Sequence, residues 1–144
     1  GQGIVLFDGA ELRDFVKKAA WVTLNDYEAQ LLRERTGQSI EALARGVRAI
    51  VVTLGSKGSQ VYTEGRVVDI PAATARTIKD PTGCGDAYRA GLLHGLAHGL
   101  DWETTGRIAA LMGAIKIEHP GTQNHRFTRD EFKARFRESF GYAL

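Results

Sequence analysis

The sequence is poor in cysteine, methionine and proline, with one Cys, one Met and three Pro in 144 residues. A single cysteine excludes an internal disulfide framework and any zinc site built from several cysteines. It also favours a reducing compartment, so we expect a cytoplasmic protein. No stretch approaches the roughly 18 consecutive apolar residues that a membrane span needs. Residues 1–7 contain no basic region and are followed at once by Asp8, which argues against a secretory signal.

Neither sign of charge dominates, because 19 Lys and Arg face 17 Asp and Glu, for a net charge of +2. These charges are scattered, whereas a nucleic-acid-binding protein concentrates basic residues on one face. We therefore expect neither a nucleic acid nor a membrane as partner. A hydrophobic content of 43% and a charged content of 25% are typical of a globular protein. The length favours a single domain.

Strand-like and helical segments alternate along the chain, which is typical of parallel strands joined by crossover helices. We expect an α/β fold with a mostly parallel sheet flanked by helices. Phe132, Phe136 and Phe140 recur every four residues and predict one core-facing side of a final helix. The expected strands are 4–7, 21–24, 49–54, and a hairpin of 59–63 and 66–70; the expected helices are 10–20, 26–35, 40–44, an apolar helix from Ala87 onward, and 128–139.

The most informative stretch runs from Asp80 to Gly91 and reads D-P-T-G-C-G-D-A-Y-R-A-G. Gly83 and Gly85 allow a tight turn whose N–H groups point at an anion. The apolar spacing that follows places this turn at the positive end of a helix dipole. Asp86, in the first helical turn, is positioned to accept a proton from a hydroxyl held beside the anion. The alternative is an ordinary turn and a helix-capping aspartate.

The whole stretch resembles the C-terminal signature D-T-x-G-A-G-D-x-F-x-A-G of the ribokinase family, also called the PfkB carbohydrate kinases. The resemblance implies that Asp86 is the catalytic base and that the amides of Gly83, Cys84 and Gly85 form an anion hole. Two positions depart from the pattern: Pro81 replaces the usual Thr, and Cys84 replaces the usual Ala. Both residues are small enough for the loop.

Asn25 and Glu28 follow an apolar run and resemble the N-x-x-E motif of the same family. In that family the pair organises Mg²⁺, its waters and the phosphates. The alternative is a helix N-cap followed by an acidic residue that suits the helix dipole. Asp26 is a further acidic candidate, without support from the family.

A second motif, Thr53 to Ser59, lies between two strand-like runs. It lacks the spacing of a Walker loop and resembles the T-x-G-x-x-G nucleotide loop of the family. By this match Thr53, Gly55 and Gly58 approach the phosphates or ribose of ATP, and Lys57 is a weaker candidate. The alternative is a hairpin turn.

The resemblance extends through the small-residue segment 107–114 and the loop 121–125. It places Ala109, Gly113 and Asn124 on the adenine side, although small residues there are equally compatible with helix packing. It also makes Asp80, Thr82 and Gly121 neighbours of a K⁺ ion.

Members of the family are about twice this length, so we expect residues 1–144 to be the C-terminal, nucleotide-binding and catalytic portion of a kinase domain. The expected activity is transfer of the γ-phosphoryl group of ATP to a nucleoside, as in adenosine kinase-like members, with a sugar such as ribose or fructose as the alternative acceptor. A non-catalytic nucleotide-binding piece is a further alternative. A sheet cut in this way exposes an edge, which predicts a homo-oligomer or association with the missing N-terminal half.

Overall fold

The computed structural model describes residues 2–144, which form two compact units that meet between Asp69 and Ile70. The first unit contains η1 (Gln2–Leu6), α1 (Gly9–Lys18), β1 (Trp21–Asn25), α2 (Asp26–Thr36), α3 (Ile40–Ala44), β2 (Ala49–Thr53), η2 (Gly55–Lys57), β3 (Ser59–Thr63) and β4 (Arg66–Ile70), whose last residue belongs to the second unit. The second unit contains α4 (Cys84–Ala97), α5 (Trp102–Ile117) and α6 (Arg129–Phe140).

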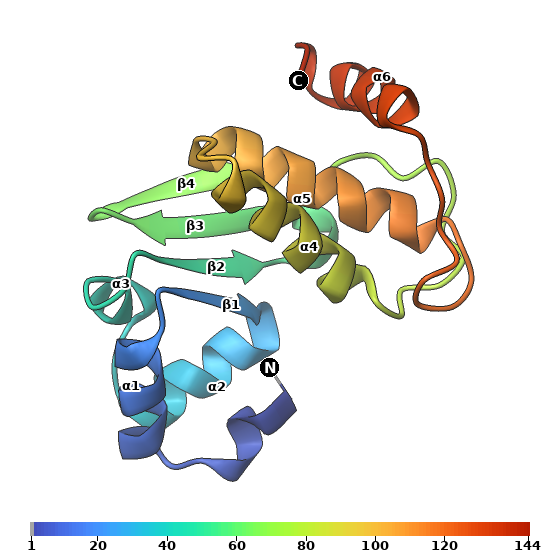
Figure 1. The fold of residues 1–144 in the computed structure, drawn as a ribbon. Helices are drawn as coiled ribbons and strands as arrows, with labels where there is room; N and C mark the ends of the chain where they lie inside the picture. The colour runs from blue at the N-terminus through green and yellow to red at the C-terminus, as the bar shows by residue number, and fades with distance from the viewer. Residues whose placement is uncertain (1) are drawn as a thin grey trace. The chain divides into compact units, whose positions relative to one another are not determined.

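The four strands form one sheet in the order β1-β2-β3-β4 (Figure 1). Strands β1 and β2 are parallel, with Asn25 opposite Thr53, whereas β2 and β3 are antiparallel. Strands β3 and β4 are joined by the two-residue turn Glu64–Gly65, a connection that only antiparallel strands can use. The α/β class is confirmed, but the sheet of this chain is mixed rather than mostly parallel, because short connections follow β2 and β3.

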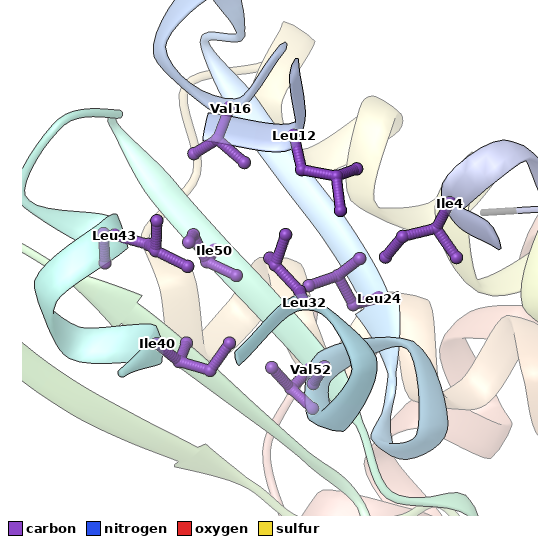
Figure 2. Packing of buried hydrophobic residues seen from close by; sticks show 11 residues of the cluster. Ile4, Leu12, Val16, Leu24, Leu32, Ile40, Leu43, Ile50 and Val52 are labelled. Carbon is purple, nitrogen blue, oxygen red and sulfur yellow. The ribbon is translucent and has the colours of Figure 1, made fainter. Parts of the chain in front are cut away.

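Apolar side chains from the helices of the first unit pack on the sheet residues Leu24, Ile50 and Val52 (Figure 2). The interior strand β2 is buried at every position except Thr53, which explains its continuous apolar sequence. Each of α1 and α2 begins with a capping box, in which the N-cap side chain and a glutamate bond each other's backbone amides. The labelled core residues of Figure 2 are Ile4, Leu12, Val16, Leu24, Leu32, Ile40, Leu43, Ile50 and Val52.

The expected strand over residues 4–7 is wrong, because this segment belongs to the 3-10 helix η1 and the turn after it. The Arg35 guanidinium donates hydrogen bonds to the carbonyls of Ile4, at 3.1 Å, Val5, at 2.9 Å, and Phe7. A strand would point successive carbonyls to opposite sides. A turn, in contrast, can direct three carbonyls toward the single Arg35 guanidinium. The turn in residues 4–7 is thus stabilised by a residue that is distant in sequence.

In the second unit α4 and α5 are in close contact because small residues line their interface (Figure 1). A Cβ at Gly91 would lie 2.5 Å from the Cα of Ala109, so only glycine fits there. A second core joins α5 to α6 through Phe132 and Phe136, with Phe140 packed against it. The expected packing role of these phenylalanines is confirmed.

The remaining expected elements agree with the structure to within two residues at each end, except that α4 begins at Cys84, three residues before the expected start at Ala87. The helix 40–44 agrees at both ends. Among residues 2–144, no helix has both the length and the apolar character that crossing a bilayer requires.

Candidate active site

The loop before α4 forms a turn that only glycine accommodates at its centre. Gly83 has φ of 84°, and a Cβ there would lie 3.2 Å from the Cα of Thr122. Gly83 is also the N-cap of α4, and no side chain in the described residues caps this helix. The first turn of α4 therefore lacks the side-chain partner that other helix starts have, as an anion-binding helix N-terminus requires.

Asp86 lies in this first turn, and 83% of its side chain is exposed. The Arg89 guanidinium, one turn further along α4, donates to its Oδ1 at 2.8 Å. The amide of Cys84 donates to the Pro81 carbonyl at 3.1 Å. Burial raises the pKa of the Cys84 thiol, which makes this cysteine a poor nucleophile at neutral pH. An accessible carboxylate thus stands beside an uncapped helix start.

Asp80 fixes the beginning of the same loop. Its Oδ1 accepts a hydrogen bond from the Thr82 amide at 2.8 Å, and its Oδ2 accepts one from the Gly121 amide at 2.7 Å. Hydrogen bonds from the Thr82 side chain, then from the Thr82 and Gly121 amides, together with the Lys116 charge, lower the pKa of Asp80 to about 2. Asp80, Thr82 and Gly121 therefore lie together, as expected for neighbours of a K⁺ ion, and direct hydrogen bonds among them hold this arrangement.

Lys116 is a residue that the sequence analysis missed. Its side chain is fully buried at the last turn of α5, and its Nζ donates to the carbonyl oxygens of Asp80, at 2.8 Å, and His119, at 3.1 Å. Nothing in the pattern around residue 116 distinguishes this lysine from a surface lysine at a helix end.

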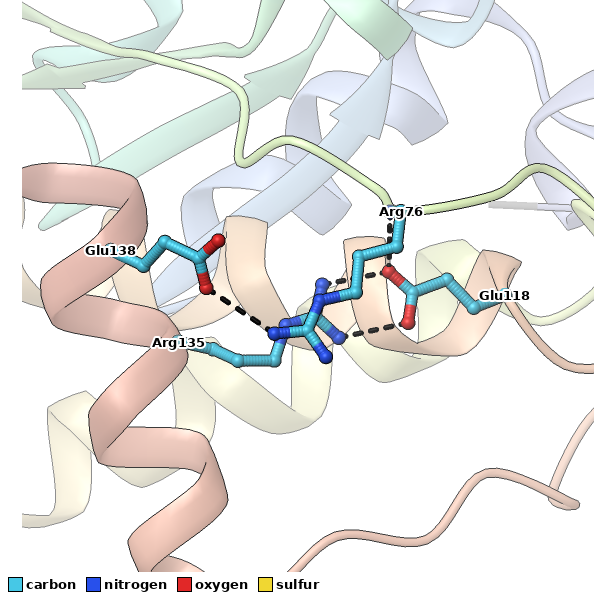
Figure 3. A network of polar contacts seen from close by, with 4 residues as sticks. All are labelled: Arg76, Glu118, Arg135 and Glu138. Atoms are coloured by element: carbon cyan, nitrogen blue, oxygen red, sulfur yellow. Dashed lines mark hydrogen bonds and ion pairs between the residues drawn. The ribbon is translucent and has the colours of Figure 1, made fainter.

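Glu118 is the second residue that sequence reasoning missed. Its carboxylate accepts two hydrogen bonds from the Arg135 guanidinium, at 2.7 and 2.8 Å, and one from the Arg76 amide at 2.7 Å (Figure 3). Burial by itself would raise the pKa of Glu118, but these bonds outweigh it and lower the pKa. The Arg76 side chain also pairs with Glu138 at 3.3 Å. The network joins α5, α6 and the segment that leads to Asp80.

In the first unit, Asn25 and Glu28 are bonded to each other at the start of α2. The Asn25 Oδ1 accepts from the Glu28 amide at 2.7 Å, and the Glu28 Oε2 accepts from the Asn25 amide at 3.0 Å. This is the capping arrangement that the sequence left open as the alternative. The motif is thus a structural element of the helix start, whether or not it also serves a ligand.

The second motif of the first unit lies beside the first. Thr53 ends β2 directly opposite Asn25 of β1, and its Oγ1 donates to the Leu24 carbonyl at 3.4 Å. Gly55 and Gly58 have φ of 61° and 94°, so both need the freedom of glycine. Because parallel strands end at a common edge, the two motifs meet at the carboxyl ends of β1 and β2, where α/β proteins bind ligands.

The three residues placed on the adenine side have different environments. Ala109 is completely buried against Gly91, which is a packing role. Gly113 is half-buried, and a Cβ there would lie 3.8 Å from the Cys84 carbonyl. Asn124 is exposed and donates from Nδ2 to the Pro120 carbonyl at 3.0 Å. Gly113 and Asn124 thus remain open to a ligand role, whereas Ala109 holds two helices together.

The described residues differ in how well they fit the groups that the family implies. The uncapped start of α4 suits a phosphate. The described residues contain no cluster of three His, Cys, Asp or Glu side chains suited to a metal. For Mg²⁺, Glu28 is the carboxylate that would hold the ion through water. A K⁺ ion does not fit at the Asp80 carbonyl, because the Lys116 ammonium already donates to this oxygen and supplies the positive charge there.

Solved structures define the class of fold. The Burkholderia thailandensis nucleoside kinase in complex with inosine is 48% identical, with a TM-score of 0.96 over 100% of this chain and 48% of that chain. The same kinase in complex with ADP-inosine matches with a TM-score of 0.96 at 48% identity, over 99% of this chain and 45% of that chain. The Methanocaldococcus jannaschii nucleoside kinase, an archaeal member of the ribokinase family, has a TM-score of 0.91 at 31% identity, over 96% of this chain and 46% of that chain. The chain has the ribokinase-like α/β fold.

The pattern of the pfkB family of carbohydrate kinases matches residues 8–129, so the chain belongs to this family. In sequence, the M. jannaschii nucleoside kinase is 32% identical over 131 residues, which are 91% of this chain and 43% of that protein. The chain therefore spans less than half the length of these relatives.

Proposed function

We propose that the protein containing this chain is a kinase that transfers the γ-phosphoryl group of ATP to a hydroxyl of a nucleoside. Membership of the pfkB family supports phosphoryl transfer to an alcohol. The relatives from M. jannaschii and B. thailandensis are nucleoside kinases, and the latter has been solved with inosine and with ADP-inosine. These relatives favour a nucleoside over a free sugar such as ribose or fructose.

The proposed chemistry uses the loop before α4. Asp86 accepts the proton of the attacking hydroxyl, and the amides of Gly83 to Gly85 stabilise the negative charge on the transferring group. The Cys84 amide would do so by exchanging its bond to the Pro81 carbonyl for one to the phosphate. Asp86 pairs with Arg89 in the free protein, and the incoming hydroxyl competes with this guanidinium for the carboxylate. Phosphoryl transfer needs little more than such positioning and charge stabilisation.

The edge formed by β1 and β2 supplies the remaining contacts in this proposal. Thr53, Gly55 and Gly58 approach the nucleotide, and Asn25 and Glu28 lie beside them at the same strand ends. Mg²⁺, when bound, would neutralise charge on the phosphates. Glu28 would hold it through water with the oxygen Oε1, since Oε2 is bonded to the Asn25 amide.

The observation that carries the proposal is the exposed Asp86 carboxylate beside the uncapped start of α4. We expect Asp86→Asn in the full-length polypeptide to lower turnover roughly 10²–10⁴-fold, with little change in the affinity for ATP. Asp130→Asn is the matched control, because Asp130 is also an exposed aspartate in the first turn of a helix. Unchanged turnover in Asp86→Asn would remove the base assignment.

A panel of nucleosides and sugars, with ADP release as the readout, tests the acceptor. Phosphorylation of inosine or adenosine is the expected result, and activity confined to ribose or fructose would contradict a nucleoside kinase. The chain spans under half the length of its relatives. A second candidate function for residues 1–144 alone is therefore nucleotide binding without turnover. Calorimetry with MgATP beside a turnover assay of the isolated chain distinguishes the two.

Strand β1 supports the predicted association with further polypeptide. It is an edge strand of the described sheet, and beside it lies an apolar hollow of about 490 Å³ lined by Phe7, Phe15 and Trp21 among others. Exposed edges and apolar surfaces of this kind are usually covered. We expect a second copy, or the N-terminal half of a longer protein, to cover it. The cytoplasm, where ATP is consumed, is our prediction for its location.

A further inference from the structure

The buried Lys116 side chain sits where two backbone segments meet. Its Nζ donates to the carbonyl of Asp80, in the loop before α4, and to the carbonyl of His119, after the end of α5. The Lys79 and Asp80 amides also donate to the Ile117 carbonyl, at 2.9 and 3.1 Å. The ammonium thus lies at the centre of the contact that fixes the loop.

An ammonium in a fully buried position is costly unless it is well paired. Here two carbonyl oxygens accept from it, the Asp80 carboxylate contributes negative charge nearby, and the C-terminal end of α5 adds the negative pole of the helix dipole. Backbone carbonyls are also the ligands with which proteins replace the hydration shell of K⁺. The site is therefore built to hold one positive charge, and the chain supplies that charge itself.

We propose that Lys116 is a positioning residue whose ammonium takes the place of a monovalent cation beneath the Asp80–Gly83 loop, so that the protein works without K⁺. The ammonium orients the Asp80 carbonyl, and Asp80 in turn binds the Thr82 and Gly121 amides. Removing the ammonium leaves two carbonyls facing an unfilled space. The loop then loses its fixed approach to Gly83.

The test compares KCl with tetramethylammonium chloride at equal ionic strength, in the full-length polypeptide, with the thermal midpoint and kcat as readouts. The wild-type protein should give the same values in both salts. Lys116→Ala should lower the midpoint by several degrees and kcat roughly 100-fold through misplacement of the loop. K⁺ or propylammonium, which matches the atoms removed, should restore both readouts, whereas tetramethylammonium should not.

Two further variants separate the charge from the packing. Lys79→Ala removes an exposed lysine from the same segment and should behave as wild type in both salts. Lys116→Met keeps most of the volume and should be impaired without rescue, because it leaves no room for an ion. A wild-type protein that K⁺ stabilises or activates would overturn the proposal, and so would a Lys116→Ala variant that no cation restores.

The activity readout rests on the proposed function, but the thermal readout does not. A protein that phosphorylates no nucleoside would contradict the proposed function, while salt-specific rescue of the midpoint in Lys116→Ala would still support the role of Lys116.

Discussion

Replacing Glu118 by glutamine should strongly destabilise the protein. Only 10% of the Glu118 side chain and 12% of the Arg135 side chain are exposed, so their ion pair is shielded from water. Glu118→Gln keeps the size but leaves the Arg135 guanidinium without a counter-charge. Breaking a buried pair in this way costs about 3–5 kcal/mol. The amide of Arg76 can keep one acceptor oxygen, so its contribution to this loss is small.

Urea denaturation of the full-length polypeptide at neutral pH measures the loss in the free energy of unfolding. Glu138→Gln is the matched control, because Glu138 pairs with Arg76 in the same network but 70% of its side chain is exposed. An exposed pair contributes only about 0–1 kcal/mol. The double variant Glu118→Gln, Arg135→Met should lose less than Glu118→Gln alone, because no uncompensated charge remains. Equal losses for Glu118→Gln and Glu138→Gln would refute the reasoning.

Two further predictions concern the second unit. Gly91→Ala should cost about 1–3 kcal/mol of stability, because the new Cβ would lie 2.5 Å from the backbone of Ala109. The control Gly113→Ala, whose Cβ has ordinary contacts, should be neutral or stabilise by about 0.5–1 kcal/mol. Equal effects of the two variants in a thermal melt would contradict the close contact at Gly91. Because the pKa of Asp80 falls from 3.8 to about 2 on folding, its stabilising contribution is complete above pH 4 and is lost as the pH falls toward 2; thermal midpoints measured from pH 5 to pH 2 should therefore fall more steeply for wild type than for Asp80→Asn.

Local sequence signals predicted most of the elements, since each depends on a few neighbouring residues. Asn25 with Glu28, and Thr128 before the last helix, form capping boxes that mark helix starts. The glycines at positions 55, 58 and 83 occupy backbone conformations that other residues rarely adopt. The Asp80–Gly91 signature, together with the Asn25–Glu28 and Thr53–Ser59 motifs, predicted the family, which the pattern match to residues 8–129 confirms.

The failures share a different physical cause, because each depends on contacts between residues distant in sequence. Residues 4–7 look like a strand, but Arg35 draws their carbonyls into a turn. Lys116 and Glu118 look like surface charges at a helix end, and they become buried only because residues 80 and 135 fold onto them. The roles of Asp86, Asn25 and Glu28 in catalysis stay predictions.

The double attachment of Glu118 has a practical consequence for work on this protein. Its carboxylate holds Arg135 on α6 and, at the same time, the Arg76 amide in the stretch that leads to Asp80. Truncating the chain at Arg129, as is often done to improve expression or crystals, would remove Arg135. The buried Glu118 carboxylate would then lack its counter-charge beside that stretch. Poor turnover of the shortened protein would then reflect a loosened backbone between Arg76 and Gly83, and not the loss of a substrate contact on α6.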